Sequence, residues 1–340
     1  MTIEQDLQTT IDQLVQPAKG ILAADESLPT IAKRFAPVGV DPTEENRRVY
    51  RTLLFSTPGV DEYLCGVIEF EETLQQQDDK GTPLPQLLAT RGITPGVKVD
   101  KGTEPLCNAP GDLVTRGLDD LKERLNRYRK LGARFAKWRE VYPLTVTNPT
   151  RLGRQTNAEM LARYAATCQN AGIVPIVEAE VLMDGDHDIG RCAEVTQQVL
   201  HAVFHALHRH RVTLEHMILK PNMVLPGKDC RQAPPEEVAE ATLKVFRRCV
   251  PASVPGIYFL SGGQSPEEAT VNLNAMNAGS PANPWLLSFS YGRALQHPVL
   301  EAWRGKPENI PAAQQALLKR ARLNAAAQLG QYRSDMENDA

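Results

Sequence analysis

The sequence has little excess charge and no long apolar run, and both absences narrow the classes of protein it can encode. Its 38 lysines and arginines nearly balance its 41 aspartates and glutamates, which leaves a formal net charge of −3 over 340 residues. This balance gives no sign of the broad basic surface that binds nucleic acid or anionic membranes. No apolar run is long enough to cross a bilayer, and the acidic opening, Met1–Leu7, lacks the apolar core of a secretory signal. We expect a cytoplasmic globular protein with no nucleic-acid and no membrane partner.

Cysteine is scarce, and the six cysteines form no Cys-x-x-Cys pair. In a chain of this length, scattered cysteines predict free thiols in a reducing compartment, not a disulfide framework or a zinc site. Three histidines recur at helical spacing, but Ala202 stands where a zinc-protease motif needs glutamate, which favours a solvated helix face. The cysteines are Cys65, Cys107, Cys168, Cys192, Cys230 and Cys249, and the histidines are His201, His205 and His208.

Eight short apolar segments recur down the chain and alternate with stretches of helical periodicity. Strand alternating with helix implies parallel pairing through crossover helices. No linker rich in proline, glycine or serine divides the chain, so the pattern favours an α/β fold, a single (β/α)8 TIM barrel, over two domains. The expected strands are 20–27, 62–70, 94–100, 132–140, 173–180, 216–224, 256–262 and 285–292.

The chain is longer than the roughly 250 residues that such a barrel needs, so the surplus predicts additional segments. We expect an extra N-terminal helix, long loops and a C-terminal helix near Pro311–Gly330 within one domain of residues 1–330, followed by a short, polar, mobile tail of residues 331–340. An open, doubly wound sheet is the alternative. That fold usually carries Gly-x-Gly-x-x-Gly after its first strand, where this chain has Ala24-Asp25-Glu26-Ser27.

Local signals predict where three of the helices begin. Asp41-Pro42-Thr43-Glu44 and Ser265-Pro266-Glu267-Glu268 each combine a capping residue, a proline at the first helical position and a following carboxylate. Thr156-Asn157-Ala158-Glu159 has the pattern of a capping box and predicts a helix that runs toward Gly172.

Charged residues stand inside the expected strands, where barrel strands are normally apolar. Alternation along 133–139 puts Lys137 and Arg139 on one face, and alternation along 173–180 does the same for Glu178 and Glu180. All of these charges fall toward the C-terminal strand ends, where active sites assemble in a parallel barrel. Strand-end charges that reach bulk water are the alternative, but repetition over five strands favours a convergent cluster. The three other strands contribute Asp25, Lys98 and Lys220.

A cluster of this composition indicates a specific chemistry. A lysine beside other cations and apolar walls has its ammonium form disfavoured, which frees an amine that attacks a carbonyl and forms an iminium. Neighbouring carboxylates would move protons, and the remaining basic side chains would bind anionic groups, above all phosphate. Two glycine-containing turns, Leu260–Gln264 and Ser290–Arg293, follow the seventh and eighth expected strands. Loops there commonly bind phosphate in barrels, although the glycines would also serve tight turns alone.

The segments that carry these charges resemble those of class I fructose-1,6-bisphosphate aldolases. The match runs in order from about Asp6 to Tyr332. The motifs Lys-Pro-Asn-Met and Phe-Leu-Ser-Gly-Gly-Gln-Ser, when they occur together, are highly specific to this family. The matching segments are Gly20-Ile-Leu-Ala-Ala-Asp-Glu-Ser27, Gly96-Val-Lys-Val-Asp-Lys-Gly102, Phe135-Ala-Lys-Trp-Arg139, Ile173-Val-Pro-Ile-Val-Glu178, Leu219-Lys-Pro-Asn-Met-Val224, Phe259-Leu-Ser-Gly-Gly-Gln-Ser265 and Phe289-Ser-Tyr-Gly-Arg-Ala-Leu295.

The resemblance implies a lyase of sugar-phosphate metabolism that cleaves fructose 1,6-bisphosphate reversibly and needs neither a metal nor a cofactor. By resemblance, Lys220 is the Schiff-base lysine, Glu178 the acid/base of carbinolamine dehydration and Asp25 the base for the C4 hydroxyl. Lys137 would assist imine formation, and Glu180 would orient its neighbours. One phosphate would lie against Ser261, Gly262, Gly263, Ser290, Gly292 and Arg293, and the other against Ser27, Arg34, Lys98 and Arg139.

The chain departs from the family pattern in three places. Ala179 replaces a proline between the two glutamates, and Leu28-Pro29-Thr30 replaces a Thr-Gly-Ser stretch. The family's animal members end in a tyrosine that assists proton exchange, whereas this chain ends in Asp339-Ala340, so we expect different proton exchange. The alternatives are an aldolase that also acts on sedoheptulose 1,7-bisphosphate, a metal-dependent aldolase and a non-catalytic binding homologue. A homodimer or homotetramer fits the resemblance.

Overall fold

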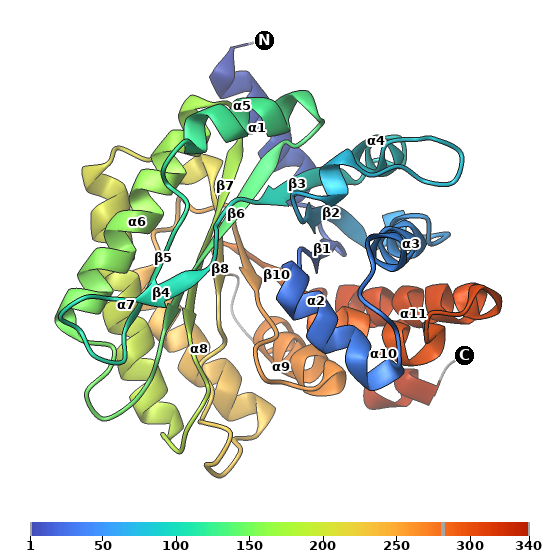
Figure 1. Ribbon diagram of the computed structural model, residues 1–340. Coiled ribbons are helices and arrows are strands. Elements are labelled where there is room, and N and C mark those ends of the chain that lie inside the picture. The colour runs from blue at the N-terminus through green and yellow to red at the C-terminus, as the bar shows by residue number, and fades with distance from the viewer. Residues whose placement is uncertain (1, 280–282, 339–340) are drawn as a thin grey trace.

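The computed structural model describes residues 2–279 and 283–338, and its centre is a closed barrel of eight parallel strands (Figure 1). Around the barrel, the strands follow the order β1-β10-β9-β8-β7-β6-β3-β2. Each expected strand is present, which confirms the (β/α)8 prediction over the open sheet. The strands are β1 Gly20–Ala24, β2 Leu64–Glu69, β3 Thr94–Lys98, β6 Phe135–Tyr142, β7 Val174–Val181, β8 Ile218–Pro221, β9 Gly256–Phe259 and β10 Leu286–Tyr291.

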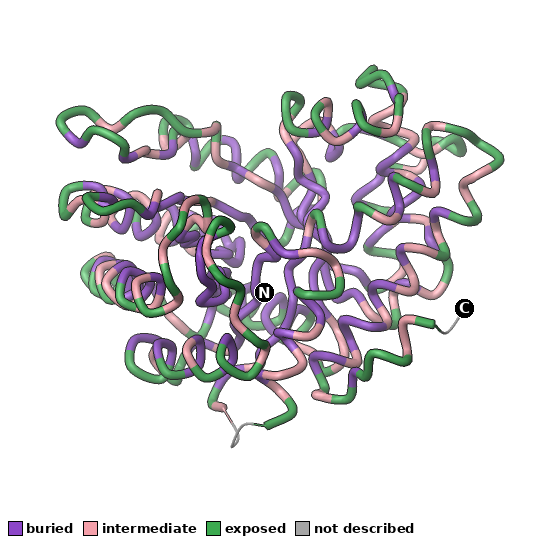
Figure 2. The backbone as a smooth tube through the Cα atoms, turned by 90° about the horizontal axis from the view of Figure 1, so that it is seen from below, coloured by how far each residue is buried: buried purple, intermediate pink, exposed green. Residues whose placement is uncertain are grey.

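Helices surround the barrel, and their buried faces pack on the outside of the strands, as the purple inner segments of Figure 2 show. The helices are α1 Ile3–Leu14, α2 Leu28–Phe35, α3 Glu44–Phe55, α4 Leu84–Ala89, α5 Leu121–Lys130, α6 Arg151–Asn170, α7 Ile189–Arg209, α8 Pro235–Cys249, α9 Pro266–Ala278, α10 Arg293–Trp303 and α11 Ile310–Gln328. Short 3-10 helices are η1 Ala36–Val38, η2 Val60–Glu62, η3 Thr73–Gln75, η4 Leu214–His216, η5 Pro307–Asn309 and η6 Ser334–Asn338. The structure thus has the expected extra helices α1 and α11. In the described chain no helix combines the length and the apolar character that a membrane span requires.

The amino-terminal end of the barrel is closed by an apolar cluster. Helix α1 contributes Leu7, Ile11 and Leu14, which pack against inward-facing strand residues, among them Phe135. Phe135 fills the barrel because β3 has a glycine beside it: a Cβ on Gly96 would lie 2.3 Å from the Phe135 ring. With one end of the barrel sealed and apolar, the polar strand residues are left at the other, carboxyl end.

Two of the three predicted helix starts are wrong. One helix is capped by Thr43, two residues after the predicted Asp41, and the other by Thr150, six residues before the predicted Thr156. Thr43 caps α3 by accepting the Asn46 N–H at 3.1 Å, and the Asn46 side chain donates to the backbone carbonyl of Asp41 at 2.8 Å. Helix α6 starts at Thr150, whose hydroxyl donates to Asp112 at 2.6 Å, so Thr156 lies inside the helix. The capping box at Ser265 is confirmed.

A two-stranded antiparallel hairpin that the sequence pattern did not predict lies beside β6. Its strands are β4 Thr103–Pro105 and β5 Leu113–Thr115, drawn in teal in Figure 1. Three-residue strands with exposed side chains on β4 carry no apolar alternation, so periodicity could not reveal them. The hairpin joins the barrel through Thr115, whose hydroxyl donates to the Arg139 carbonyl at 2.7 Å.

The described part of the C-terminal tail contacts the last helix. The Tyr332 side chain is buried, and Glu337 pairs with the buried Arg320 of α11 at 2.6 Å. Lys319 also donates to the Glu337 carbonyl at 2.5 Å. The division into a barrel domain and a separate, mobile tail stays a prediction, and Asp339 and Ala340 lie outside the described residues.

Candidate active site

A cavity of about 460 Å³ opens at the carboxyl end of the barrel, and all fifteen residues predicted from the sequence line it. They come from the ends of seven barrel strands and from α2, segments that are distant in the sequence. The structure therefore brings the whole predicted set together, whereas the role of each residue stays a prediction. The cavity also contains seven residues that were not predicted: Ala23, Glu26, Thr30, Asp100, Gly102, Thr103 and Leu260.

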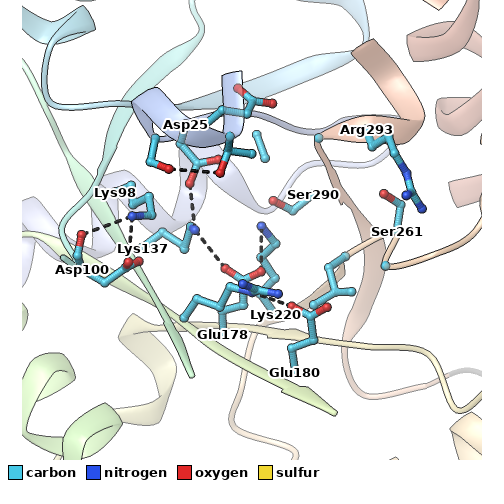
Figure 3. Close-up of a pocket in the computed structure, with 18 of the residues that line it drawn as sticks. Asp25, Lys98, Asp100, Lys137, Glu178, Glu180, Lys220, Ser261, Ser290 and Arg293 are labelled. Carbon is cyan, nitrogen blue, oxygen red and sulfur yellow. Dashed lines mark hydrogen bonds and ion pairs between the residues drawn. The ribbon is translucent and has the colours of Figure 1, made fainter. Parts of the chain in front are cut away.

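Four charged side chains form the centre of this cavity (Figure 3). Lys137 Nζ lies 2.7 Å from Asp25 Oδ2 and 3.2 Å from Glu178 Oε2. On the other side of Glu178, its Oε1 lies 3.4 Å from Lys220 Nζ. The barrel register creates this arrangement, because Glu178 on β7 stands directly beside Lys220 on β8, while Asp25 follows the end of β1.

The electrostatics of this cluster are set by burial and by opposite charge. Burial by itself would raise the pKa of Asp25, but the charges of Lys137 and Lys220 outweigh it and hold that pKa well below its ordinary value. The pKa of Glu178 is lowered through the same competition, with Lys137 as its strongest counter-charge. Burial opposes the charge of Lys137, yet Asp25 and Glu178 raise its pKa. At neutral pH the cluster therefore holds two carboxylates in contact with the ammonium group of Lys137.

A second set of ion pairs surrounds this centre toward the cavity mouth. Arg139 pairs with Glu180 at 2.5 Å, and Lys98 pairs with Asp100 at 2.7 Å. Arg139 is the more exposed partner, with 40% of its side chain accessible, so it can reach a ligand that enters from solvent. Asp100 was missed although it ends the expected strand 94–100 and alternates with Lys98 as Arg139 does with Lys137. That alternation was the signal that could have identified it.

A buried carboxylate behind α2 organises the same side of the cavity. Glu26 Oε1 lies 3.0 Å from Arg34 Nη1 and accepts from Gln296 at 2.8 Å, while its Oε2 accepts from Arg51 at 2.7 Å. Arg34 is thereby held at the cavity wall by a side chain adjacent in sequence to Asp25. Sequence reasoning could not identify Glu26, because its partners on α3 and α10 are far away along the chain.

The turn after β9 and the start of α10 line the opposite wall, where the sequence predicts a phosphate site. Gly263 has a φ of 77°, a region that glycine favours, and a Cβ there would lie 1.6 Å from Met183 Sδ. The Ser290 hydroxyl is buried and finds no hydrogen-bond partner within the described chain. Arg293 is the first residue of α10, so its guanidinium and the helix N-terminus face the same space. Hydroxyls, free N–H groups and a cation in this arrangement suit a phosphate.

The candidate metal ligands of the sequence do not assemble. His201, His205 and His208 are exposed on α7. Within residues 2–279 and 283–338, no group of three or more histidine, cysteine, aspartate or glutamate side chains is placed to hold a metal ion.

Comparison with known proteins adds independent information. Residues 6–340 match the family model described as fructose-bisphosphate aldolase class-I. The chain is 52% identical to fructose-bisphosphate aldolase 5, cytosolic, from Arabidopsis thaliana, over 98% of this chain and 94% of that one, and 53% identical to the fructose-bisphosphate aldolase of Drosophila melanogaster, over 97% and 92%.

Among solved structures, the Plasmodium falciparum fructose-bisphosphate aldolase in complex with TRAP and a small-molecule inhibitor superposes with a TM-score of 0.96 at 49% identity. That superposition covers 98% of this chain and 96% of the solved chain. The family match, the identity over nearly the full length and the shared barrel agree with each other and with the motifs at the strand ends. The chain belongs to the class I fructose-bisphosphate aldolase family.

Proposed function

We propose that this chain cleaves fructose 1,6-bisphosphate reversibly into dihydroxyacetone phosphate and glyceraldehyde 3-phosphate through a Schiff base on Lys220. The observation that carries the proposal is the buried cluster in which Lys220 and Lys137 share Glu178, while Asp25 contacts Lys137. Family membership supports the same reaction. The relatives named cytosolic support a cytosolic location for this chain, and a homodimer or homotetramer belongs to the same proposal.

The first half of the reaction takes place at Lys220. Its Nζ attacks the C2 carbonyl of the sugar, and the amine proton passes through Glu178, 3.4 Å away, to the former carbonyl oxygen. Glu178 then takes up a proton from solvent and delivers it to that hydroxyl, which leaves as water while the nitrogen lone pair closes the iminium. Lys137 lies 3.2 Å from Glu178 and stabilises the negative charge that returns to its carboxylate.

The second half breaks the carbon–carbon bond. Asp25, held ionised by Lys137 at 2.7 Å, takes the proton of the C4 hydroxyl. The C3–C4 bond electrons move to C3 and into the iminium, so the aldehyde product departs and an enamine remains. Protonation of the enamine at C3 regenerates the iminium, and water hydrolyses it to release dihydroxyacetone phosphate and the free amine of Lys220.

Each wall of the cavity binds one of the two phosphates of the substrate. The C1 phosphate lies against Ser261, Ser290 and Arg293, because Ser261 follows β9, the direct neighbour of β8 and its Lys220, and the other two residues belong to the next strand, β10, and the helix after it. The second phosphate lies at the opposite wall, among Lys98 and Arg139, with Ser27 and Arg34 nearby. Phosphates at both ends fix the reacting carbons over the central cluster, which is how remote binding contributes to the rate.

Borohydride reduction in the presence of dihydroxyacetone phosphate tests the proposal directly. We expect an irreversible secondary amine on Lys220, located by mass spectrometry of peptides, and no label in a Lys220→Met variant. Absence of the label from the native chain would overturn the mechanism. Steady-state cleavage of fructose 1,6-bisphosphate, fructose 1-phosphate and sedoheptulose 1,7-bisphosphate, each with and without a chelator, then measures substrate preference. A chain that binds these sugars without cleaving them would be a non-catalytic homologue.

A further inference from the structure

Strand β6 carries a buried carboxylate, Glu140, that the proposed reaction does not use. Lys137 and Arg139 face the cavity, whereas Trp138 and Glu140 alternate with them and face outward from the barrel. Glu140 is only 1% exposed. A carboxylate is expensive to bury without partners, so its presence on the outer face of a barrel strand requires an explanation.

Both oxygens of Glu140 accept hydrogen bonds from groups that can only donate. Trp138 Nε1–H donates to Oε1 at 2.8 Å, and the Thr115 backbone N–H donates to Oε2 at 3.2 Å. The first bond fixes the carboxylate on β6 itself. The second connects β6 to Thr115 at the end of β5, in the β4–β5 hairpin. Burial raises the pKa of Glu140 to about 8, and these two donors act against that rise.

The hairpin that Glu140 holds forms part of the cavity wall. Thr115 is paired with Thr103 of β4, and Thr103 and Gly102 line the cavity. The Arg116 N–H also donates to the Gly102 carbonyl at 2.9 Å, which continues the pairing toward the barrel. Any shift of β5 relative to β6 is therefore passed on to the cavity-lining residues of β4.

Two basic groups of the second-phosphate wall depend on the same contacts. Arg139 is the residue before Glu140, and its carbonyl accepts the Thr115 hydroxyl at 2.7 Å. Lys98 is held at 2.7 Å by Asp100, which leads directly into Gly102 and the hairpin. Arg139 and Lys98 thus approach the cavity from two strands that are joined, outside the barrel, by the hairpin.

We infer that Glu140 is a positioning residue that fixes the β4–β5 hairpin on β6 and thereby sets the affinity for the second phosphate of the substrate. This inference rests on the proposed function and deepens it. Glu140 does not touch the substrate. It selects for a sugar with phosphates at both ends because it acts on the wall of Lys98 and Arg139 and leaves the wall of Ser261 and Arg293 unchanged.

The test compares Glu140→Gln with two other hairpin variants. The amide that replaces the carboxylate can accept only one of the two hydrogen bonds, since its NH2 group must face a donor. Thr115→Val is milder, because it removes the hydroxyl bond to the Arg139 carbonyl and leaves the backbone N–H in place. Glu104→Gln is the matched control: Glu104 is on β4, half exposed, and pairs only loosely with Arg116 at 3.6 Å.

We expect Glu140→Gln to raise KM for fructose 1,6-bisphosphate by roughly 5- to 10-fold, the size of effect that loss of one hydrogen bond produces. KM for fructose 1-phosphate, which lacks the second phosphate, should stay within about 2-fold, and kcat for both sugars likewise. Thr115→Val should raise only the bisphosphate KM, by a smaller factor, and Glu104→Gln should change neither. Thermal melting of each variant establishes that it is folded.

An equal rise of KM for both sugars, a fall in kcat alone, or no change would each overturn the inference. If Glu140→Gln does not fold, Thr115→Val decides by the same comparison of the two sugars. Assay of the native chain distinguishes a failure of this inference from a failure of the proposed function. Native cleavage of fructose 1,6-bisphosphate with an unselective Glu140 variant refutes only the positioning role, whereas a native chain that does not cleave the sugar refutes the proposed function.

Discussion

Replacement of Lys137 by methionine would remove the cation that two buried carboxylates share. Lys137 and Asp25 are 5% and 11% exposed, and the distances from Lys137 Nζ are 2.7 Å to Asp25 and 3.2 Å to Glu178. With an effective dielectric constant of about 20, the Coulomb energies at these distances are about 6 and about 5 kcal/mol before desolvation is subtracted. Removal of one partner from a buried pair typically costs about 3–5 kcal/mol, so we expect Lys137→Met to lose that much stability at pH 7.

The pH dependence of this loss identifies its cause. In the native chain the pKa of Asp25 is lowered, so its contribution is fully present above its ordinary pKa of 3.8 and is lost only as the pH falls below that value. Without Lys137, we expect burial to outweigh the remaining charges of Lys220 and Lys98 and to raise the pKa of Asp25 above its ordinary value. The folded variant then binds a proton near neutrality that the unfolded chain does not, so its stability increases as the pH falls. For one proton this is about 1.4 kcal/mol per pH unit, or about 2.7 kcal/mol between pH 7 and pH 5.

Denaturant unfolding at pH 5, 6 and 7, followed by tryptophan fluorescence, measures this difference between Lys137→Met and the native chain. The control is Lys228→Met, which breaks an ion pair with Asp184 at 2.5 Å whose two side chains are more than half exposed. Its effect should stay below about 1 kcal/mol at every pH. A stability loss for Lys137→Met that is the same at pH 5 and pH 7 would refute the reasoning, because it would show that no carboxylate takes up a proton in the variant. Cleavage by Lys137→Met should also fall by roughly 10²- to 10⁴-fold in kcat.

Three further predictions concern phosphate binding and metal dependence. Gly263→Ala should lower the melting temperature and raise KM for fructose 1-phosphate by roughly 10-fold, because the new Cβ enters the space of Met183 and residue 263 has a positive φ. If the melting temperature and KM are both unchanged, this turn does not have the proposed role. Arg293→Ala should raise KM for fructose 1-phosphate and fructose 1,6-bisphosphate alike by roughly 10-fold or more, whereas Lys98→Ala should do so only for the bisphosphate. The opposite pattern in a steady-state assay would mean that each wall binds the other phosphate. Dialysis against EDTA should leave the cleavage rate unchanged, since the electron sink is an iminium, and a loss restored by a divalent metal would argue for a metal-dependent aldolase.

The fold and the charged centre of the site could be predicted because both follow from local pattern, whereas Ser27 and Arg34 were predicted only from the family resemblance. Parallel strands place their C-terminal ends at one rim, so charges that recur at strand ends, such as Lys137 and Glu178, predict a common location without any knowledge of the register. The partners of each charge were not predictable in the same way. Nothing in the sequence indicates that Glu26 holds Arg34, since the bond depends on how α2 packs on the barrel.

The errors at helix starts have a similar origin. Asp41 and Thr43 are both good capping residues two positions apart, and local sequence gives no reason to prefer one. In the structure the Thr43 hydroxyl accepts the Asn46 N–H, and the Asn46 side chain donates to the backbone carbonyl of Asp41. At α6, the distant Asp112 binds the N–H and the hydroxyl of Thr150 and so fixes the helix start six residues before Thr156. Capping signals therefore predict that a helix begins, while side-chain partners from elsewhere decide where.

The barrel register explains why the cluster has this balance of charge. Lys98 on β3 and Lys137 on β6 are direct neighbours in the register, an arrangement of two like charges that is unfavourable in a buried wall. Each lysine is stabilised by a carboxylate that follows a strand end, Asp100 for Lys98 and Asp25 for Lys137. In the proposed reaction, a dianionic phosphate takes over the role of Asp100 at Lys98, while Asp25 stays on Lys137 to act as the base. The same register thus places the proposed binding cation, Lys98, and the proposed catalytic cation, Lys137, on adjacent strands.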